Sequence, residues 1–227
     1  MESPGASADP PERVLELRDA AIGLHALIVV DSTARGPAFG GIRRARYADV
    51  AAARADACAL ARAMTRKCAL AGLPAGGAKT VVLDDGRADH ARLYPAIGEA
   101  VDALGGAYVC GPDVGTGAAE LELVRARTRH CNPASNDASV ATAAGVLAAL
   151  RAVWPLLGGS APIGATAIVQ GLGGVGSIVA RELVALGATV YGCDVDAGAR
   201  ARAQADGVAL VDDAFARSCD VLVPCAL

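Results

Sequence analysis

AIVQGLGGVGSIVARELVALGATVYGCDVD, residues 167–196, decides the fold expected for the second half of this chain. A predicted strand leads into a G-x-G-x-x-G pattern formed by Gly171, Gly173 and Gly176, a predicted helix follows, and a second strand ends at Asp194. In such a unit the first glycine allows a tight turn, the second lets backbone approach a pyrophosphate, and the third lets the helix pack closely on the strand. This strand–turn–helix context predicts a Rossmann-type dinucleotide site, which the glycines alone would not.

The free N–H groups at the start of that helix are expected to hold the phosphate charge. Asp194 can accept hydrogen bonds from both ribose hydroxyls and would repel a 2′-phosphate, so the sequence favours NAD over NADP. Asp194 or Asp196 could instead cap the next helix, an alternative that is stronger for Asp196. The expected cofactor-binding residues of the turn and strand are Gly171, Leu172, Gly173, Gly174, Val175, Gly176 and Asp194.

Strands and helices alternate in both halves of the chain, which predicts an α/β protein with parallel sheets. Residues 1–12 are rich in Pro, Ser, Gly and acidic residues and are expected to be disordered. The loop-like composition of 131–139 predicts a boundary between a catalytic and oligomerisation domain, 13–132, and a truncated NAD-binding Rossmann domain, 139–227. In the first half and the linker the expected strands are 22–33, 36–47, 79–85 and 107–115, and the expected helices are about 49–64, 88–104, 117–130 and 140–154.

The composition, with 53% hydrophobic residues and a net charge of -3, argues against disorder and against recruitment by nucleic acid or an anionic membrane. Seven scattered cysteines without a C-x-x-C pair indicate a reduced, cytoplasmic protein with no metal site. The longest candidate membrane segment, 139–157, contains Arg151 and Pro155, so no membrane span is expected.

Only two of the 21 cationic side chains are lysine, and both lie in MTRKCALAGLPAGGAK, residues 64–79. An ammonium group can lose its proton when buried, whereas a guanidinium group cannot in practice. We therefore interpret Lys67 and Lys79 as functional amines rather than as surface lysines retained by chance. Asp113, in GPDVG after a predicted strand, is placed as an active-site carboxylate would be in an α/β domain, although it could also simply form a turn.

Five segments in the same order carry a resemblance to a known family: GPAFGGIR, MTRKCALAGLPAGGAKTVVLDD, YVCGPDVGT, SVATAAGV and VQGLGGVG. From about Ala20 to its last residue, the chain resembles the leucine/phenylalanine/valine branch of the Glu/Leu/Phe/Val amino-acid dehydrogenases. The resemblance implies two α/β domains with a cleft between them and a homo-oligomer assembled through the first. It also implies NAD-dependent, reversible oxidative deamination of an apolar L-amino acid to its 2-oxo acid and ammonia.

The resemblance implies a role for each matching residue. Lys79 matches the catalytic lysine that activates the water attacking an imine, and Asp113 matches the carboxylate that exchanges protons with the substrate nitrogen. Lys67 matches the lysine that pairs with the substrate carboxylate. The remaining matches are Gly40 and Gly41 beside the substrate, and Ser139 and Thr142 near the nicotinamide.

The chain also departs from the family pattern. Pro112 replaces an acidic residue, Val140 replaces a proline, and family members continue well past the terminal PCAL. We expect either a fragment of a longer enzyme or an inactive homologue that binds nucleotide or co-assembles with a full-length paralogue. Phe39 should fill space beside the substrate and Gly111 should open it, so only an apolar substrate side chain is predicted.

Overall fold

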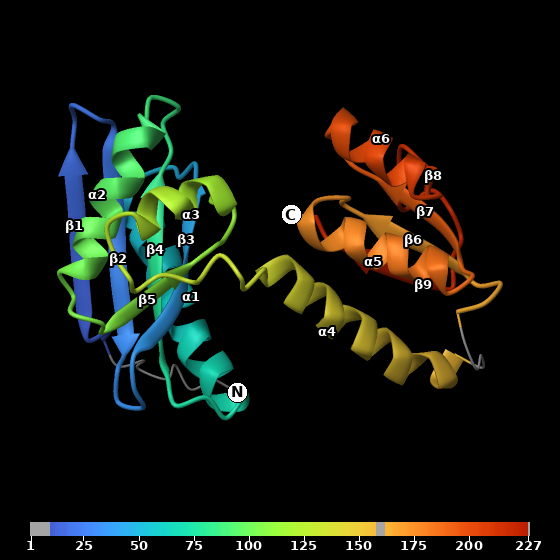
Figure 1. The fold of residues 1–227 in the computed structure, drawn as a ribbon, viewed down its shortest axis with the longest axis horizontal. Helices are drawn as coiled ribbons and strands as arrows, with labels where there is room; N and C mark the ends of the chain where they lie inside the picture. The colour runs from blue at the N-terminus through green and yellow to red at the C-terminus, as the bar shows by residue number, and fades with distance from the viewer. Residues whose placement is uncertain (1–9, 158–161, 227) are drawn as a thin grey trace, which may run out of the picture. The chain divides into compact units, whose positions relative to one another are not determined.

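The computed structural model describes residues 10–157 and 162–226. It divides into two compact units, which we call unit 1, Met1–Asn136, and unit 2, Asp137–Leu227. The division falls inside the loop-like segment 131–139. Each unit is an α/β structure with its own sheet and its own core (Figure 1).

Most of the stretch expected to be disordered, residues 1–9, lies outside the described residues. Glu12, near the end of that stretch, accepts hydrogen bonds from the backbone N–H and the hydroxyl of Thr33 at 2.8 and 2.7 Å. These bonds hold Glu12 beside the end of the second strand.

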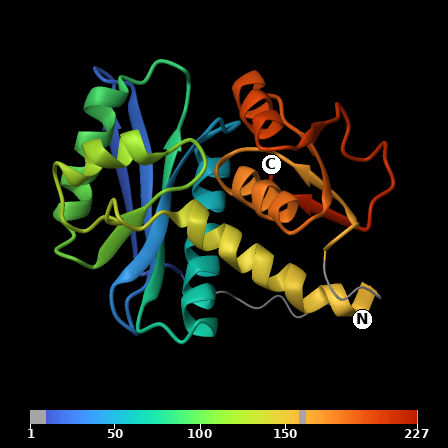
Figure 2. The same ribbon diagram turned by 45° about the vertical axis from the view of Figure 1, so that its right-hand side comes forward.

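Unit 1 contains a five-stranded sheet in the order β1-β2-β4-β3-β5, with helices on both faces (Figures 1 and 2). Its elements are β1 (Arg13–Asp19), β2 (Leu24–Ser32), β3 (Ala38–Ala45), α1 (Val50–Leu70), β4 (Gly76–Leu83), α2 (His90–Asp102), β5 (Tyr108–Gly111) and α3 (Ala118–Arg125). Strand β2 pairs antiparallel with both β1 and β4, whereas β3 pairs parallel with β4 and β5. The prediction of a parallel sheet is therefore wrong for this half of the chain.

Strand β2 makes the sheet mixed, because it runs opposite to the other four strands. Strand β1, which pairs with β2 at the edge of the sheet, was not predicted from the sequence. This strand alternates charged residues with Val14, Leu15 and Leu17, and it pairs along its whole length with β2. Charged, exposed positions are typical of an edge strand, which must resist pairing with other chains. They also weaken the apolar pattern by which strands are recognised in a sequence.

Helix α1 covers one face of the sheet, and α2 and α3 cover the other (Figure 2). Alanines at four-residue intervals form the buried stripe of α1, and their small side chains let the helix approach the sheet closely. This stripe, together with the strand residues that it covers, comprises Ala53, Ala57, Ala61, Leu27, Val29 and Val81. The two elements approach closely at Gly77 on β4, where a Cβ would lie only 2.1 Å from the backbone nitrogen of Thr65.

Side chains on β4 alternate between these two faces because a strand has a period of two. Ala78 and Val82 pack in the core beneath α2 and α3, whereas Val81 packs beneath α1. Lys79, two residues before Val81, therefore lies on the α1 face with only 6% of its surface exposed. The strand period places an amine in the protein interior.

Unit 2 contains a four-stranded parallel sheet in the order β8-β7-β6-β9. Its elements are α4 (Ala138–Val153), a 3-10 turn (Trp154–Leu157), β6 (Thr166–Gln170), α5 (Gly174–Ala185), β7 (Thr189–Cys193), α6 (Ala197–Ala205), β8 (Ala209–Leu210) and β9 (Val221–Pro224). In the numbering of the doubly wound dinucleotide fold, this order reads 3-2-1-4, so the unit has four of that fold's six strands. The predicted fold class, an α/β unit followed by an incomplete Rossmann-type unit, is confirmed.

Among the described residues, the helical segment Ala138–Leu156 is long and apolar enough to cross a membrane, with 17% of it buried. This differs from the expectation that no segment qualifies. Its buried residues, Ala143 and Leu147, belong to the core of unit 2 together with Val179 and Leu183 of α5. One face of this helix therefore serves as a core face of unit 2.

We expect Gly77→Ala to lower the free energy of unfolding by about 2 kcal/mol or more, because the new methyl group would meet two backbone atoms of α1. Gly111→Ala is the matched control, since its Cβ would meet nothing closer than the Asn132 Cβ at 3.6 Å. Urea denaturation of the two variants measures the difference. Equal stabilities would contradict a close approach of α1 to β4 at Gly77.

Candidate functional site

The site predicted in unit 1 centres on an ion pair between Lys79 of β4 and Asp113, which follows β5. The Lys79 Nζ contacts Asp113 Oδ2, and the side chains of Lys79 and Asp113 are 7% and 18% exposed. Strands β4 and β5 lie on either side of β3, so the sheet brings together residues that are far apart in the sequence. The structure therefore joins the two residues predicted to be catalytic.

Two further charged residues extend this pair. The Arg43 guanidinium of β3 donates from Nε to Asp113 Oδ2 at 3.1 Å and from a terminal nitrogen to Asp56 of α1 at 3.3 Å. Asp56 also accepts a hydrogen bond of 2.6 Å from the hydroxyl of Tyr47. The network contains two cations and two carboxylates and is therefore electrically balanced without a ligand.

The environment shifts the pKa values of the side chains in this network. Burial lowers the pKa of Lys79 and the charge of Arg43 adds to this effect, and together they outweigh the opposing influence of Asp113. Burial alone would raise the pKa of Asp113, but the hydrogen bond and charge of Lys79, helped by Arg43, leave it below its ordinary value. Burial and the hydrogen bond to Asp56 raise the pKa of Tyr47 to about 12. Lys79 therefore releases its proton more readily than an exposed lysine.

Because Gly40 and Gly41 have no side chains, β3 can lie close to the residues of the ion-pair network. A Cβ on Gly41 would lie 2.8 Å from the Asp113 Cβ and 2.5 Å from the carbonyl oxygen of Pro112. A Cβ on Gly40 would lie 1.7 Å from the carbonyl oxygen of Ala78, the residue before Lys79. Side chains at these positions would push β3 away from the two strand segments that carry the ion pair.

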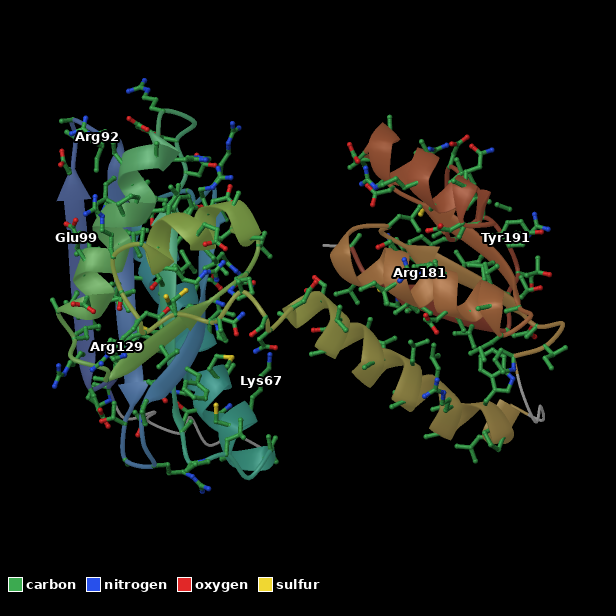
Figure 3. All side chains as sticks on the ribbon, in the orientation of Figure 1. Lys67, Arg92, Glu99, Arg129, Arg181 and Tyr191 are labelled. Atoms are coloured by element: carbon green, nitrogen blue, oxygen red, sulfur yellow. The ribbon has the colours of Figure 1, made fainter. Side chains whose placement is uncertain are left out.

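Lys67 is placed differently. It lies in the last turn of α1, is exposed, and projects from the helix surface (Figure 3). Because α1 packs on the sheet face from which Lys79 projects, both amines belong to the same side of the unit 1 sheet. The structure therefore does not separate them on opposite faces, but it buries only Lys79.

In unit 2 the three fingerprint glycines occupy three different environments. Gly171 has a φ of 88° in the tight turn, and a Cβ there would crowd Cys225 and Ala226. Gly173 has open space around its would-be Cβ, and it precedes α5 without any side-chain cap. A Cβ on Gly176 would lie 1.8 Å from the Gly171 carbonyl oxygen, so this glycine permits close packing of helix and strand.

This geometry fits a bound phosphate. The N–H groups of the first turn of α5 have no side-chain partner at Gly173, and the neighbouring space is open. Leu172 is buried and Val175 is partly buried, so these two residues of the predicted turn serve the core of unit 2. Backbone N–H groups at a helix start are suited to hold the charge of a pyrophosphate.

Asp194 is held in position at the end of β7. Its two carboxylate oxygens accept hydrogen bonds from the backbone N–H groups of Asp196 and Leu172, at 2.8 and 2.6 Å, and these bonds lower the pKa of Asp194. Asp196 caps α6 by accepting from Ala199 N at 2.6 Å, so the alternative capping role belongs to Asp196. A pocket of about 420 Å³ beside Asp194 is lined by, among others, Gln170, Gly171, Asp212, Asp213 and Phe215.

Ser139 and Thr142 lie in the first turns of α4. A Cβ on Gly174 would lie 2.6 Å from Ser139 Oγ, so Ser139 borders the start of α5. Thr142 is exposed, and its hydroxyl donates to the carbonyl oxygen of Ala138 at 2.7 Å. Only Ser139 of the two therefore contacts the glycine-rich segment directly.

Sequence reasoning missed Arg43 and Asp56. The available signal for Arg43 was its position two residues after Gly41 on one strand, which places both on the same face of the sheet. No short-range pattern points to Asp56, because its contact with β3 depends on how α1 packs on the sheet. Among the described residues no group of three or more His, Cys, Asp or Glu side chains is arranged to hold a metal ion.

Comparison with known proteins identifies the family of this chain. The family described as Glu/Leu/Phe/Val dehydrogenase, dimerisation domain, matches residues 11–130. Leucine dehydrogenase of Bacillus subtilis is 36% identical, with 95% of this chain and 62% of that protein covered. Valine dehydrogenase of Streptomyces albus is 38% identical, with 95% and 63% covered.

Two solved structures are also similar. L-tryptophan dehydrogenase from Nostoc punctiforme matches with a TM-score of 0.68 and 30% identity, covering 96% of this chain and 64% of that one. The hetero-hexameric glutamate dehydrogenase from Thermus thermophilus matches with a TM-score of 0.71 and 26% identity, covering 95% and 62%. The chain therefore spans less than two thirds of the length of these relatives.

We expect Asp113→Asn to lower the free energy of unfolding by about 2 kcal/mol or more at neutral pH, because it leaves the Lys79 ammonium buried without its carboxylate. The folded-state pKa of Asp113 is depressed, so its contribution is present above the unfolded-state pKa of about 3.9 and is lost as the pH falls further. The difference from wild type should therefore shrink as the pH falls below about 3.9, as measured by urea denaturation at a series of pH values.

The double variant Lys79→Met/Asp113→Asn is the control. Removing both charges should recover part of the stability lost in Asp113→Asn, because no buried ion then lacks a partner. A loss in Asp113→Asn that is independent of pH and unchanged in the double variant would contradict the ion pair.

Proposed function

This chain belongs to the Glu/Leu/Phe/Val dehydrogenase family, and on that premise we propose that it belongs to an NAD-dependent enzyme that oxidatively deaminates an apolar L-amino acid. The products are the 2-oxo acid and ammonia, and the reaction is reversible. The observation that carries the proposal is the buried Lys79–Asp113 pair beside Gly41. Such a pair supplies a proton acceptor and a proton donor in one place.

Lys79 acts as the base. Because its pKa is lowered, Lys79 is neutral more often than an exposed lysine at the same alkaline pH, and the neutral amine can take a proton from water. That water adds to the carbon of the imine formed from the substrate. Arginine could not serve here, because a guanidinium does not release its proton in this pH range.

Asp113 handles the proton on nitrogen. Its carboxylate accepts a proton from the substrate amine and returns one to the departing ammonia. Hydrogen bonds from Lys79 and Arg43 hold the carboxylate in position and keep it ionised between these events. Arg43 is a positioning residue in this scheme, because its contacts are with carboxylates of the protein.

We propose that Lys67 pairs with the substrate carboxylate. The buried network is already balanced in charge, so the substrate carboxylate needs a further cation, and Lys67 is an exposed amine on the helix that packs on this face. Gly40 and Gly41 leave space for the substrate backbone. Phe39, which is 37% exposed, lies on β3, and Gly111 lies on the paired strand β5. Both residues are compatible with an apolar substrate side chain.

Unit 2 is proposed to bind NAD through Gly171, Gly173 and Gly176, with Asp194 on the ribose hydroxyls. When bound, NAD supplies the acceptor for the hydride that leaves the substrate Cα. Ser139 and Thr142 are proposed to lie near the nicotinamide. The carboxylates of Asp194, Asp212 and Asp213 line the neighbouring pocket and would repel the 2′-phosphate of NADP.

We also propose that the protein is a cytoplasmic homo-oligomer assembled through unit 1. The matched family segment, residues 11–130, is described as a dimerisation domain and lies in unit 1. All seven cysteines have free thiols, which fits a reducing compartment. Its small-molecule partners are an amino acid and a 2-oxo acid, and we propose no association with nucleic acid or membrane.

The activity test mixes the purified protein with NAD and L-leucine, L-valine or L-phenylalanine at alkaline pH and follows NADH absorbance. We expect turnover, and we expect Lys79→Ala to reduce kcat by roughly 10²- to 10⁴-fold. Lys79→Arg keeps the positive charge opposite Asp113 but cannot release a proton, so it should be as impaired as Lys79→Ala. Normal activity of Lys79→Arg would contradict a proton-transfer role for this residue.

The cofactor test measures binding of NAD and NADP by isothermal titration calorimetry. We expect NAD to bind roughly tenfold or more tightly than NADP. Asp194→Ser should reduce this preference, because it removes one of the carboxylates that repel the 2′-phosphate while Asp212 and Asp213 remain. Asp196→Ser, which removes a neighbouring carboxylate charge but keeps a side chain able to cap α6, is the matched control and should keep the preference. NAD binding without turnover would instead favour the inactive, nucleotide-binding homologue. Absence of binding would contradict the NAD-dependent enzyme and leave only an inactive homologue that co-assembles with a full-length paralogue.

A further inference from the structure

Two cysteines that the proposed reaction does not use lie side by side in unit 1. Cys110 is in β5, and Cys131 lies beyond α3, where the two residues form an isolated parallel bridge. The backbone N–H of Cys110 donates to the His130 carbonyl at 3.0 Å, and the N–H of Asn132 donates to the Cys110 carbonyl at 2.7 Å. These two bonds set Cys110 directly opposite Cys131.

This pairing suits a disulfide. Paired strand segments lie about 4.8 Å apart, and Cα atoms bridged by a disulfide are usually about 4.4–6.8 Å apart. Directly opposed residues also project their side chains to the same face. The Cys110 thiol donates to the carbonyl oxygen of His130, the residue before Cys131, at 3.5 Å. A bond between the two sulfurs would therefore need little backbone movement.

The surroundings shift the pKa values of the two thiols in opposite directions. The hydrogen bond with Cys110 lowers the pKa of Cys131 against the effect of burial, and the charge of Arg125 lowers it further. The bond with Cys131 and burial raise the pKa of Cys110. Arg125 is held by its bond to the Asn132 carbonyl at 2.7 Å, and its Nε is buried without a hydrogen-bond partner among the described atoms. A thiolate forms more readily at Cys131 than at Cys110.

We propose that Cys110 and Cys131 form a reversible redox site that hydrogen peroxide oxidises to a disulfide. The site would tie β5 to the segment that follows α3. Asp113 follows Cys110 after only Gly111 and Pro112, so the bond would restrain the segment that carries this carboxylate.

Oxidation would proceed in two steps. The Cys131 thiolate attacks one oxygen of hydrogen peroxide, the O–O bond breaks, and Cys131 becomes a sulfenic acid while hydroxide leaves and takes up a proton. The Cys110 sulfur then attacks the Cys131 sulfur, the S–O bond breaks, and the second hydroxide leaves as water with the Cys110 proton. Two thiols are oxidised to one disulfide, and one peroxide is reduced to two waters.

Burial determines the class of oxidant. Cys131 retains 7% exposure and Cys110 only 1%, so a reagent close to water in size reaches Cys131 first. A bulky oxidant would require the strand pairing to open. Reactivity toward peroxide with slow reactivity toward large disulfides is therefore expected of this pair.

The test treats the folded, full chain with hydrogen peroxide, blocks free thiols by alkylation under denaturing conditions, and analyses the peptides by mass spectrometry. We expect a cross-linked Cys110–Cys131 peptide pair, lighter by the mass of two hydrogen atoms and lost after reduction with dithiothreitol. Cys68 is the internal control, since it is also buried, with 3% of its surface exposed, and it should stay a free thiol that is then alkylated.

Variants separate the steps. In Cys110→Ala, oxidation should stop at a sulfenic acid on Cys131 that a dimedone probe traps, and in Cys131→Ala, Cys110 should stay reduced. Oxidation of Cys68 or the other cysteines while Cys110 and Cys131 remain free thiols would overturn the proposal, as would oxidation of Cys131 without the cross-link. Because the readout is covalent mass, it is independent of whether the chain turns over an amino acid.

Discussion

The buried ion pair between Lys79 and Asp113 is the constraint on which the rest of unit 1 depends. An ammonium taken out of water is costly unless a carboxylate meets it, so β4 and the end of β5 must be held on either side of β3. Only glycine at positions 40 and 41 lets β3 run between them at the required distance. The same burial that makes the pair costly also lowers the pKa of Lys79, which is the property that a proton-transferring amine needs.

Close backbone approach recurs in both units, and glycine permits it each time. Gly77 lets α1 lie directly on β4, which covers the face from which Lys79 projects. Gly176 lets α5 lie directly on the turn after β6, which places the helix start beside open space at Gly173. In one unit this contact helps to bury the Lys79 side chain, and in the other it leaves backbone N–H groups of a helix start beside open space.

The cysteine pair shows how the sheet adds possibilities beyond the proposed reaction. Cys110 belongs to the apolar core beneath α2 and α3, yet it lies on the strand that leads to Asp113. The strand extension that pairs it with Cys131 makes two dispersed thiols neighbours. A chemical change at this pair would be transmitted over a few covalent bonds to a carboxylate of the candidate site.

By itself, the sequence determined the α/β class, the glycine turn of unit 2 and the capping role open to Asp196. It also singled out Lys79 and Asp113 as candidate catalytic residues, which the structure brings into contact. These features depend on local spacing: strand and helix periods, a turn that only glycine can make, and an amine retained in an arginine-rich chain. It did not reveal β1, the antiparallel half of the first sheet, the network of Arg43 and Asp56, or the meeting of Cys110 with Cys131. Only the tertiary structure decided these, because strand order and helix packing bring together residues that no short-range pattern connects.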